Sequence, residues 1–178
     1  IHEGTLFLGT DATLNAARDT SHIQDGGTLS AANALFVKIF SSLNIKSGGT
    51  FIAPAKNTLF QGGFINNGTF THSNGTVTFS PKGSSNNYQV LTNGTGTGKD
   101  FYNVIKNNKN KTLRMNGDMQ VNNITLNKGI LNVDGNDLYV KGNYIANSSN
   151  RRETTNQSAS TSVIFNGTGD QNVIAHNS

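Results

Sequence analysis

Apolar and polar residues alternate in short runs along the chain. Thr5 to Leu8, Thr76 to Phe79 and Leu138 to Val140 are typical runs. An alternation of period two predicts strands that bury one face and expose the other. Turns rich in Gly and Asn separate the runs about every ten residues, and both residue types tolerate the positive φ of a sharp reversal. The pattern predicts a chain of strands and turns, with a short helix or a turn over Asp11 to Asp19 as the one exception.

The chain also shows a longer internal spacing. A shift of about 80 residues brings Phe64 onto Tyr144. A fixed spacing is typical of repeat architectures, in which neighbouring units bury a continuous core. The sequence therefore predicts one all-β module over residues 1–178, a parallel β-solenoid with about two repeats of roughly 80 residues (1–80 and 81–162) and the start of a third. A β-sandwich is the rival, because strands about every ten residues also suit that fold.

In a solenoid, the apolar side of each strand faces inward and stacks on the next strand. The alternation predicts core residues that have polar neighbours in the sequence. These are Leu126, Leu131, Val133, Val140 and Ile145. The Asn, Thr and Lys residues between such positions are expected on the outer surface.

Composition bears on whether such a chain folds. Hydrophobic residues make up 34% of the 178 residues and charged residues 13%, while Asn, Thr, Ser and Gly fill much of the remainder. Disordered chains usually have high net charge or many prolines, whereas this chain has a formal charge of +4 and 2 Pro. The apolar strand residues are spread evenly, so the sequence predicts a folded domain.

Several partners and constraints are not expected. The 14 basic residues barely outnumber the 10 acidic ones, and the clusters Lys106 to Lys111 and Arg151-Arg152 are expected in solvated turns, so no nucleic acid partner is predicted. The chain has no Cys, which excludes disulfides and Cys-ligated zinc. No apolar run approaches the roughly 20 residues of a membrane span, so no membrane insertion is predicted. The first residues lack a signal-peptide pattern, and we expect either a removed leader or a fragment.

Five stretches carry a family resemblance. They are 75–79 (GTVTF), 101–105 (FYNVI), 121–133 (VNNITLNKGILNV), 138–144 (LYVKGNY) and 163–174 (VIFNGTGDQNVI). The sequence over about residues 40–178 resembles the β-strand repeat arrays of large secreted bacterial surface proteins and adhesins of the Bacteroidetes type. The resemblance implies a right-handed parallel β-helix, a secreted or cell-surface location, and an adhesive, coat or spacer role. The first 40 residues depart from the pattern.

Catalytic and metal chemistry require groups that converge on one point, and the sequence announces no such group. The acidic residues are isolated from one another along the chain. Asp134-Gly-Asn-Asp137 offers oxygen ligands suited to calcium, but it lacks the repeated motif of calcium β-rolls and favours an ordinary turn. The histidines, which lack ligand spacing, are His2, His22, His72 and His176. No catalytic residue, metal site or cofactor is predicted, and a polysaccharide-degrading β-helix enzyme is the less favoured alternative.

The sequence offers two possible relations to carbohydrate, which are covalent attachment of glycans and binding of a carbohydrate ligand. Asn-x-Ser/Thr sequons are candidate glycan acceptors, although a chain rich in these residues produces many by chance. Their asparagines are Asn67, Asn74, Asn93, Asn110, Asn123, Asn147, Asn156 and Asn166. A carbohydrate-binding module would need exposed aromatic side chains, whereas buried ones would favour pure scaffolding. The candidates are Tyr88, Tyr102, Tyr139 and Tyr144.

The function expected from these patterns is that of a non-catalytic structural module of an extracellular surface protein or filament. Such a module gives a stiff scaffold for adhesion or self-assembly. Its expected partner is a second copy stacked head to tail, or neighbouring repeats of the same polypeptide, because both ends of the chain lie within the strand pattern. A carbohydrate-binding module is the alternative.

Overall fold

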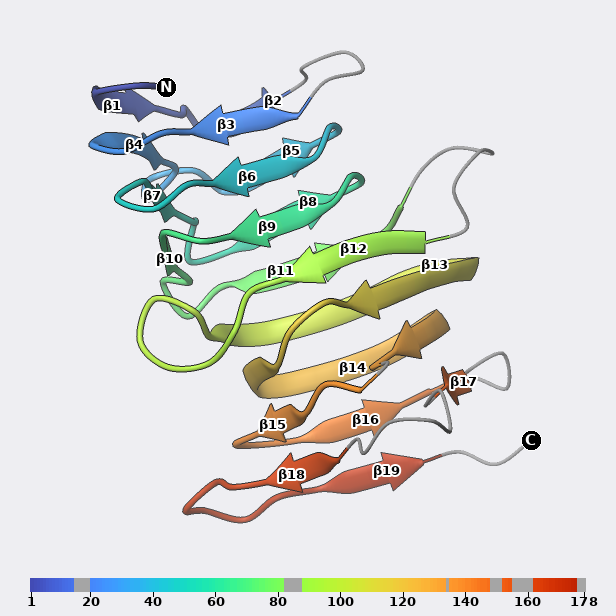
Figure 1. The fold of residues 1–178 in the computed structure, drawn as a ribbon. Coiled ribbons are helices and arrows are strands. Elements are labelled where there is room, and N and C mark those ends of the chain that lie inside the picture. The colour runs from blue at the N-terminus through green and yellow to red at the C-terminus, as the bar shows by residue number, and fades with distance from the viewer. Residues whose placement is uncertain (15–19, 82–87, 134, 148–151, 155–161, 176–178) are drawn as a thin grey trace.

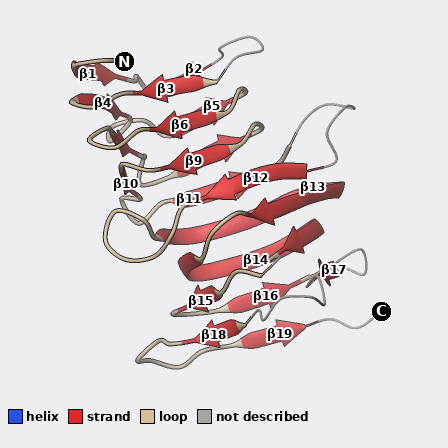
Figure 2. Cartoon of the chain, in the orientation of Figure 1, coloured by secondary structure: helices blue, strands red, loops and turns tan. Residues whose placement is uncertain are grey.

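The computed structural model describes residues 1–14, 20–81, 88–133, 135–147, 152–154 and 162–175. Within these residues the chain consists of strands and loops, without a helix (Figure 2). Accordingly, none of the described segments is a long apolar helix of the kind that crosses a membrane. Asp11 to Leu14, part of the expected helix or turn, form a strand, and residues 15–19 lie outside the described part.

The strands form a stack of rungs with three faces (Figure 1). The first face holds β1 (Gly4–Phe7), β4 (Gly27–Ser30), β7 (Thr50–Ile52) and β10 (Thr69–Thr71). The second face begins with β2 (Asp11–Leu14), β5 (Phe36–Ile39), β8 (Asn57–Phe60) and β11 (Thr76–Phe79). The third face begins with β3 (Ser21–Ile23), β6 (Leu43–Ile45), β9 (Phe64–Asn66) and β12 (Tyr88–Thr92).

Two long strands then continue the second and third faces. β13 (Phe101–Met115) pairs with β11 through its first part and with β12 through its last part, and β14 (Met119–Asn132) lies on β13. The last rungs hold β15 (Leu138–Val140), β16 (Tyr144–Ala146), β17 (Arg152–Thr154), β18 (Val163–Phe165) and β19 (Val173–Ala175). β14 pairs with β15, β16 and β17, after which β15 pairs with β18 and β16 with β19.

The pairings between these strands are parallel, and the chain winds in one right-handed sense, as parallel crossovers almost always do (Figure 1). The predicted right-handed β-solenoid is therefore confirmed. The β-sandwich is wrong, because that fold packs two antiparallel sheets face to face.

The structural repeat is the single rung. Aligned residues of neighbouring rungs lie between 18 positions apart, as for Leu113 and Leu131, and 29 positions apart, as for Tyr144 and Val173. The spacing of roughly 80 residues stays a prediction. It aligns Phe64, which lies on the third face, with Tyr144, which lies on the second.

Inward side chains stack in columns and form the core. On the first face Leu29, Phe51 and Phe70 are aligned and buried. The rings of the middle rungs contact one another with centroid separations from 4.9 Å to 5.9 Å, in tilted, stacked and edge-on arrangements that are favourable for aromatic pairs. They belong to Phe51, Phe60, Phe64, Phe70, Phe79 and Phe101. The middle of the stack is therefore held by a continuous aromatic core.

Four of the five predicted core residues are confirmed. Leu126, Leu131, Val133 and Val140 are buried. Ile145 is wrong, because it pairs with Thr125 on the outer side of the sheet and is only half-buried. Its neighbours Tyr144 and Ala146 face inward instead, and a run of three apolar residues left the phase of the alternation undetermined.

Glycine stacks at the corner between the third and first faces. A Cβ at Gly68 would lie 2.3 Å from the carbonyl oxygens of Gly49 and Lys46. Only a residue without a side chain lets successive rungs approach this closely. The corner therefore depends on glycine for the rung spacing.

Candidate functional site

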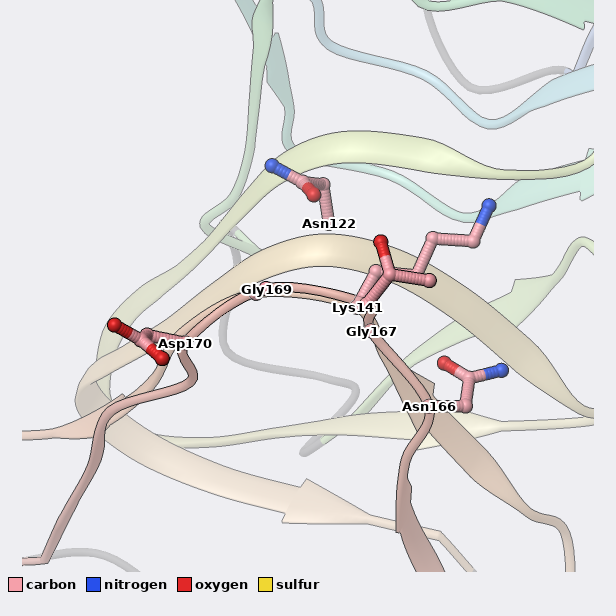
Figure 3. A pocket seen from close by; sticks show the side chains of 8 residues that line it. Asn122, Lys141, Asn166, Gly167, Gly169 and Asp170 are labelled. Carbon is pink, nitrogen blue, oxygen red and sulfur yellow. The ribbon is translucent and has the colours of Figure 1, made fainter.

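A shallow polar hollow of about 520 Å³ opens on the outside of the last three rungs (Figure 3). Its lining comes from Asn122 of β14, from Lys141 and Gly142 in the turn between β15 and β16, and from residues 166–170 in the turn between β18 and β19. The three segments lie far apart in sequence and are brought together because each occupies the same corner of its rung.

A ladder of asparagines fixes this corner from the adjacent positions. Asn123 Nδ2 donates to Asn103 Oδ1 at 2.9 Å, and Asn123 Oδ1 accepts the backbone N–H of Asn143 at 2.8 Å. Asn143 Oδ1 in turn accepts the backbone N–H of Asn172 at 3.0 Å. The ladder thus links four rungs. Two of its members, Asn123 and Asn143, directly follow Asn122 and Gly142 of the hollow in the sequence. Its side chains restrain the walls before any ligand arrives.

Gln171 holds the third wall in place. Its Nε2 donates to the carbonyl oxygen of Val140 at 2.8 Å. A Cβ at Gly167 would lie 1.7 Å from the carbonyl oxygen of Lys141, so the turn between β18 and β19 packs directly on the turn between β15 and β16. Glycine at this position is therefore a requirement of the hollow's shape.

The chemistry of the hollow is that of neutral polar recognition. Asn122 and Asn166 supply amide donors and acceptors that have no hydrogen-bond partner within the described part of the chain. Lys141 and Asp170 add one charge of each sign, and Thr168 adds a hydroxyl. Such a lining suits a ligand with many hydroxyl groups better than an apolar or strongly charged one.

Asp118 and Asp137 are isolated in the sequence but lie on neighbouring rungs. The backbone N–H of Asp137 donates to Asp118 Oδ1 at 2.8 Å, and that of Ser162 donates to Asp137 Oδ1 at 2.9 Å. Partial burial, the charges of Asp137 and Asp118 and a hydrogen bond to Asp137 raise the pKa of Tyr139. The Asp137 carboxylate thus accepts a backbone hydrogen bond, as in the ordinary turn that the sequence favours for Asp134 to Asp137. Asp134 lies outside the described residues.

His72 lies in a tight turn beside an aspartate. Its Nδ1 accepts the backbone N–H of Asn74 at 2.9 Å, its Nε2 lies 3.9 Å from Asp100 Oδ2, and its ring centroid lies 5.6 Å from that of Tyr102. His2 and His22 are exposed elsewhere, and His176 is outside the described residues. Across the described ranges, no three His, Asp or Glu side chains converge as metal ligands would.

Lys106 corrects the prediction of a solvated basic turn. It lies within β13, fully buried, in the inward column between Phe79 and Leu126. Its Nζ donates to the carbonyl oxygens of Asn108 at 3.1 Å and Lys128 at 3.3 Å. Burial lowers the pKa of Lys106 to about 8. The signal that could have revealed it is its position in the alternation, two residues after the apolar Val104.

The tyrosines differ in exposure, and exposed ones would favour a carbohydrate-binding module whereas buried ones would favour pure scaffolding. Tyr144 is buried and packs edge-on against Phe165 with ring centroids 6.3 Å apart, whereas Tyr102 and Tyr139 are half-buried on the outer surface. The side chain of Tyr88 is not among those described. The four tyrosines thus do not form one exposed row.

The sequon asparagines occupy different environments. Asn67, Asn74, Asn147 and Asn166 are exposed. Asn93 is buried and accepts a hydrogen bond from Asn66, and Asn123 belongs to the ladder. Asn156 and the side chain of Asn110 lie outside the described part. Glycosylation stays a prediction, and among the described side chains these four exposed positions are the ones that a folded chain would offer.

Comparison with known proteins gave no relatives. No family model matches the chain, no curated protein matches it, and no solved structure matches its fold.

Proposed function

We propose that this chain is a non-catalytic structural module of a secreted or cell-surface protein or filament, in which it serves as a stiff scaffold. The observation that carries the proposal is the set of inward columns that run through the rungs. One such column on the second face holds Ile39, Phe60, Phe79, Lys106, Leu126 and Ala146. The resemblance to surface-protein repeat arrays supports the same role.

The stack favours stiffness for two physical reasons. Apart from β10, which pairs with β7 alone, each described strand inside the stack is hydrogen-bonded to a neighbour on both sides, so bending the rod would strain many backbone hydrogen bonds at once. The core side chains are fully excluded from water, and each large one contributes about 1.5–3 kcal/mol on burial. A continuous core with parallel backbone pairing resists both local opening and proteolysis.

An assay for glycan degradation tests the non-catalytic part of this proposal. The folded chain is incubated with mixed extracellular polysaccharides, and product release is measured for the wild type and for Asp118→Ala, the variant that removes one of the two neighbouring carboxylates. We expect no cleavage by either protein. Reproducible cleavage by the wild type that the substitution abolishes would contradict the structural role.

Carbohydrate binding at the hollow is a second candidate function. The unpartnered amides of Asn122 and Asn166 support it, together with walls that the asparagine ladder restrains. Titration calorimetry with neutral oligosaccharides tests it, and Asn166→Ala should weaken binding. Asn67→Ala is the matched control, since Asn67 also begins an exposed Asn-Gly-Thr turn away from the hollow. Equal binding by both variants, or none by the wild type, would remove this candidate.

A further inference from the structure

The outward side of the second face is uncharged over the middle of the stack. It is formed by β8, β11, β13, β14 and β16 with the residues next to them, and these strands follow one another from rung to rung (Figure 1). The outward residues are Asn57, Leu59 and Gln61; Thr76, Thr78 and Ser80; Asn103, Ile105 and Asn107; Asn123, Thr125 and Asn127; and Asn143, Ile145 and Asn147. None of them is ionisable, although the chain has a formal charge of +4. We term this surface the amide face.

The middle column of the amide face is apolar or β-branched. The register of the parallel strands aligns its members from Leu59 through Thr78, Ile105 and Thr125 to Ile145. Each of them is half-buried, so part of each side chain stays exposed on the face. At ~4.8 Å between neighbouring strands, the column forms a straight apolar stripe about 19 Å long.

Amide side chains border this stripe on both sides. On one side Asn123 Nδ2 donates to Asn103 Oδ1 at 2.9 Å, and Asn123 Oδ1 accepts the backbone N–H of Asn143 at 2.8 Å. On the other side Asn147 Nδ2 donates to Asn127 Oδ1 at 2.9 Å. An amide group has two donor hydrogens and an oxygen with two lone pairs, so these bonds use only part of its capacity. The remainder is left for water or for a ligand.

An apolar stripe between two amide columns is complementary to a flat, neutral sugar ribbon. A sugar ring with equatorial hydroxyl groups has apolar C–H groups on its faces and hydroxyl groups at its edges. Residues four positions apart on a strand, such as Asn123 and Asn127, lie about 13 Å apart, so a chain along the stripe has an amide column at each edge. An amide can both donate to a hydroxyl group and accept from one. The neutral face favours a neutral polymer over a polyanion.

The amide face is too small for a stable contact with a second copy of this chain. At about 13 Å by 19 Å it covers about 250 Å², against ~800 Å² for each partner of a standard interface. The sheet of another copy would also bury the amide groups, and any group left without a partner would oppose binding. A polysaccharide offers hydroxyl and C–H groups along its whole length, so contacts that are weak singly add up over several rungs.

We propose that the amide face binds a neutral, ribbon-like polysaccharide that lies along the stack. The C–H faces of the sugars pack on the stripe from Leu59 to Ile145, and their hydroxyl groups exchange hydrogen bonds with the amide columns. Since hydrogen bonds between rungs already orient several amides, little side-chain freedom is lost on binding. The proposal adds a binding surface to the scaffold role and uses none of the residues of the hollow.

Cosedimentation with insoluble cellulose particles, at low and at high salt, tests the proposal. Samples without particles correct for protein that pellets by itself. Ile105→Asp places a charge in the stripe, and Ile65→Asp is its matched control, since Ile65 is also half-buried but lies on the outer side of the third face. Asn127→Ala removes one amide from a column, and Asn67→Ala is its control at an exposed position outside the face. Circular dichroism checks that each variant keeps its β spectrum.

The wild type should bind cellulose equally at both salt concentrations, because no charged group takes part. Ile105→Asp should raise the dissociation constant by about tenfold or more, since the carboxylate has no partner under a sugar ring. Asn127→Ala should raise it by about fivefold, the effect of a lost hydrogen bond. Ile65→Asp and Asn67→Ala should bind as the wild type does. If Ile105→Asp loses its β spectrum, Asn127→Ala and its control decide the question.

Four results would overturn the proposal. A folded wild type may leave all cellulose unbound, or each control may weaken binding as much as its partner variant does. Binding that disappears at high salt would assign the contact to exposed lysines beside the face, such as Lys56 and Lys128. Binding that Asn166→Ala weakens, while Ile105→Asp and Asn127→Ala do not, would place the sugar in the hollow. The scaffold role is tested separately by resistance to proteolysis, so it survives each of these results.

Discussion

Replacing Lys106 by Met should change the stability of the protein in opposite directions at neutral and alkaline pH. The ammonium group lies in the apolar column of the second face, where its two acceptors are carbonyl oxygens of Asn108 and Lys128. Burial lowers the pKa of Lys106 from 10.5 to about 8. Met has a similar length and no charge, so it can occupy the same space in the core.

The magnitude follows from linkage. A folded-state pKa of about 8 against 10.5 in the unfolded chain means that the folded state binds fewer protons between these values, so stability rises with pH through this window. Below pH 8 the buried charge costs ~3 kcal/mol, and at pH 10 the cost has fallen below ~1 kcal/mol. Met avoids that cost but loses two hydrogen bonds, at ~1 kcal/mol each. The variant should therefore be about 1 kcal/mol more stable than the wild type at pH 7 and about 1 kcal/mol less stable at pH 10.

Urea unfolding followed by circular dichroism at the two pH values measures this difference. Comparing variant with wild type at each pH cancels the titration of the other lysines and tyrosines, which both proteins share. A difference in unfolding free energy that is the same at pH 7 and pH 10 would refute the burial of the amine.

Three further predictions concern the core, the ladder and a glycine, and urea unfolding at pH 7 measures each unless another assay is named. Leu126→Asp should unfold the protein, since an unpaired buried charge costs several kcal/mol, whereas Ile145→Asp, on the outer side of the same sheet, should cost little; equal effects would contradict the assigned phase. Asn143→Ala should lower the free energy of unfolding by ~1–3 kcal/mol and speed amide hydrogen exchange in the last rung. Asn143→Asp keeps the acceptor oxygen and should cause a smaller loss, and unchanged exchange in both variants would count against the ladder. Gly129→Ala should cost several kcal/mol more than Gly96→Ala, because both have φ near +90° but only at Gly129 would a Cβ meet a carbonyl oxygen, at 2.2 Å; similar losses would show that crowding is not the cause.

The strands and turns were predictable because they depend on alternation and on turn residues, whereas the choice of a solenoid over a β-sandwich depended on the internal spacing of about 80 residues, which is not the spacing of the rungs. Four of the five core residues followed from apolar positions flanked by polar ones. Ile145 did not, because in Tyr144-Ile145-Ala146 either phase buries apolar atoms. The phase is set by the register of β16 on β14, in which Ala146 rather than Ile145 pairs with the inward Leu126.

The polar interior was much less accessible to sequence reasoning. Lys106 belongs to a basic run, and only the register of β13 with β11 and β14 shows that it faces inward. The asparagine ladder joins residues 20 and 29 positions apart, and uneven rung lengths hide such a column in the sequence. The same holds for the neighbouring carboxylates of Asp118 and Asp137 and for the hollow, since rung stacking alone brings their parts together.

The central claim is that the chain is a stiff stack of parallel rungs, and the distance between two spin labels tests it most directly. The chain has no Cys, so Lys38→Cys and Ile145→Cys give two unique sites on the outer side of the second face. Their strands are separated by five pairing steps, from Lys38 through Leu59, Thr78, Ile105 and Thr125 to Ile145. At ~4.8 Å a step, double electron-electron resonance should give a narrow distance distribution centred near 24 Å, widened only by the label side chains. A broad distribution, or a sharp one far from this value, would contradict the stacked and stiff scaffold.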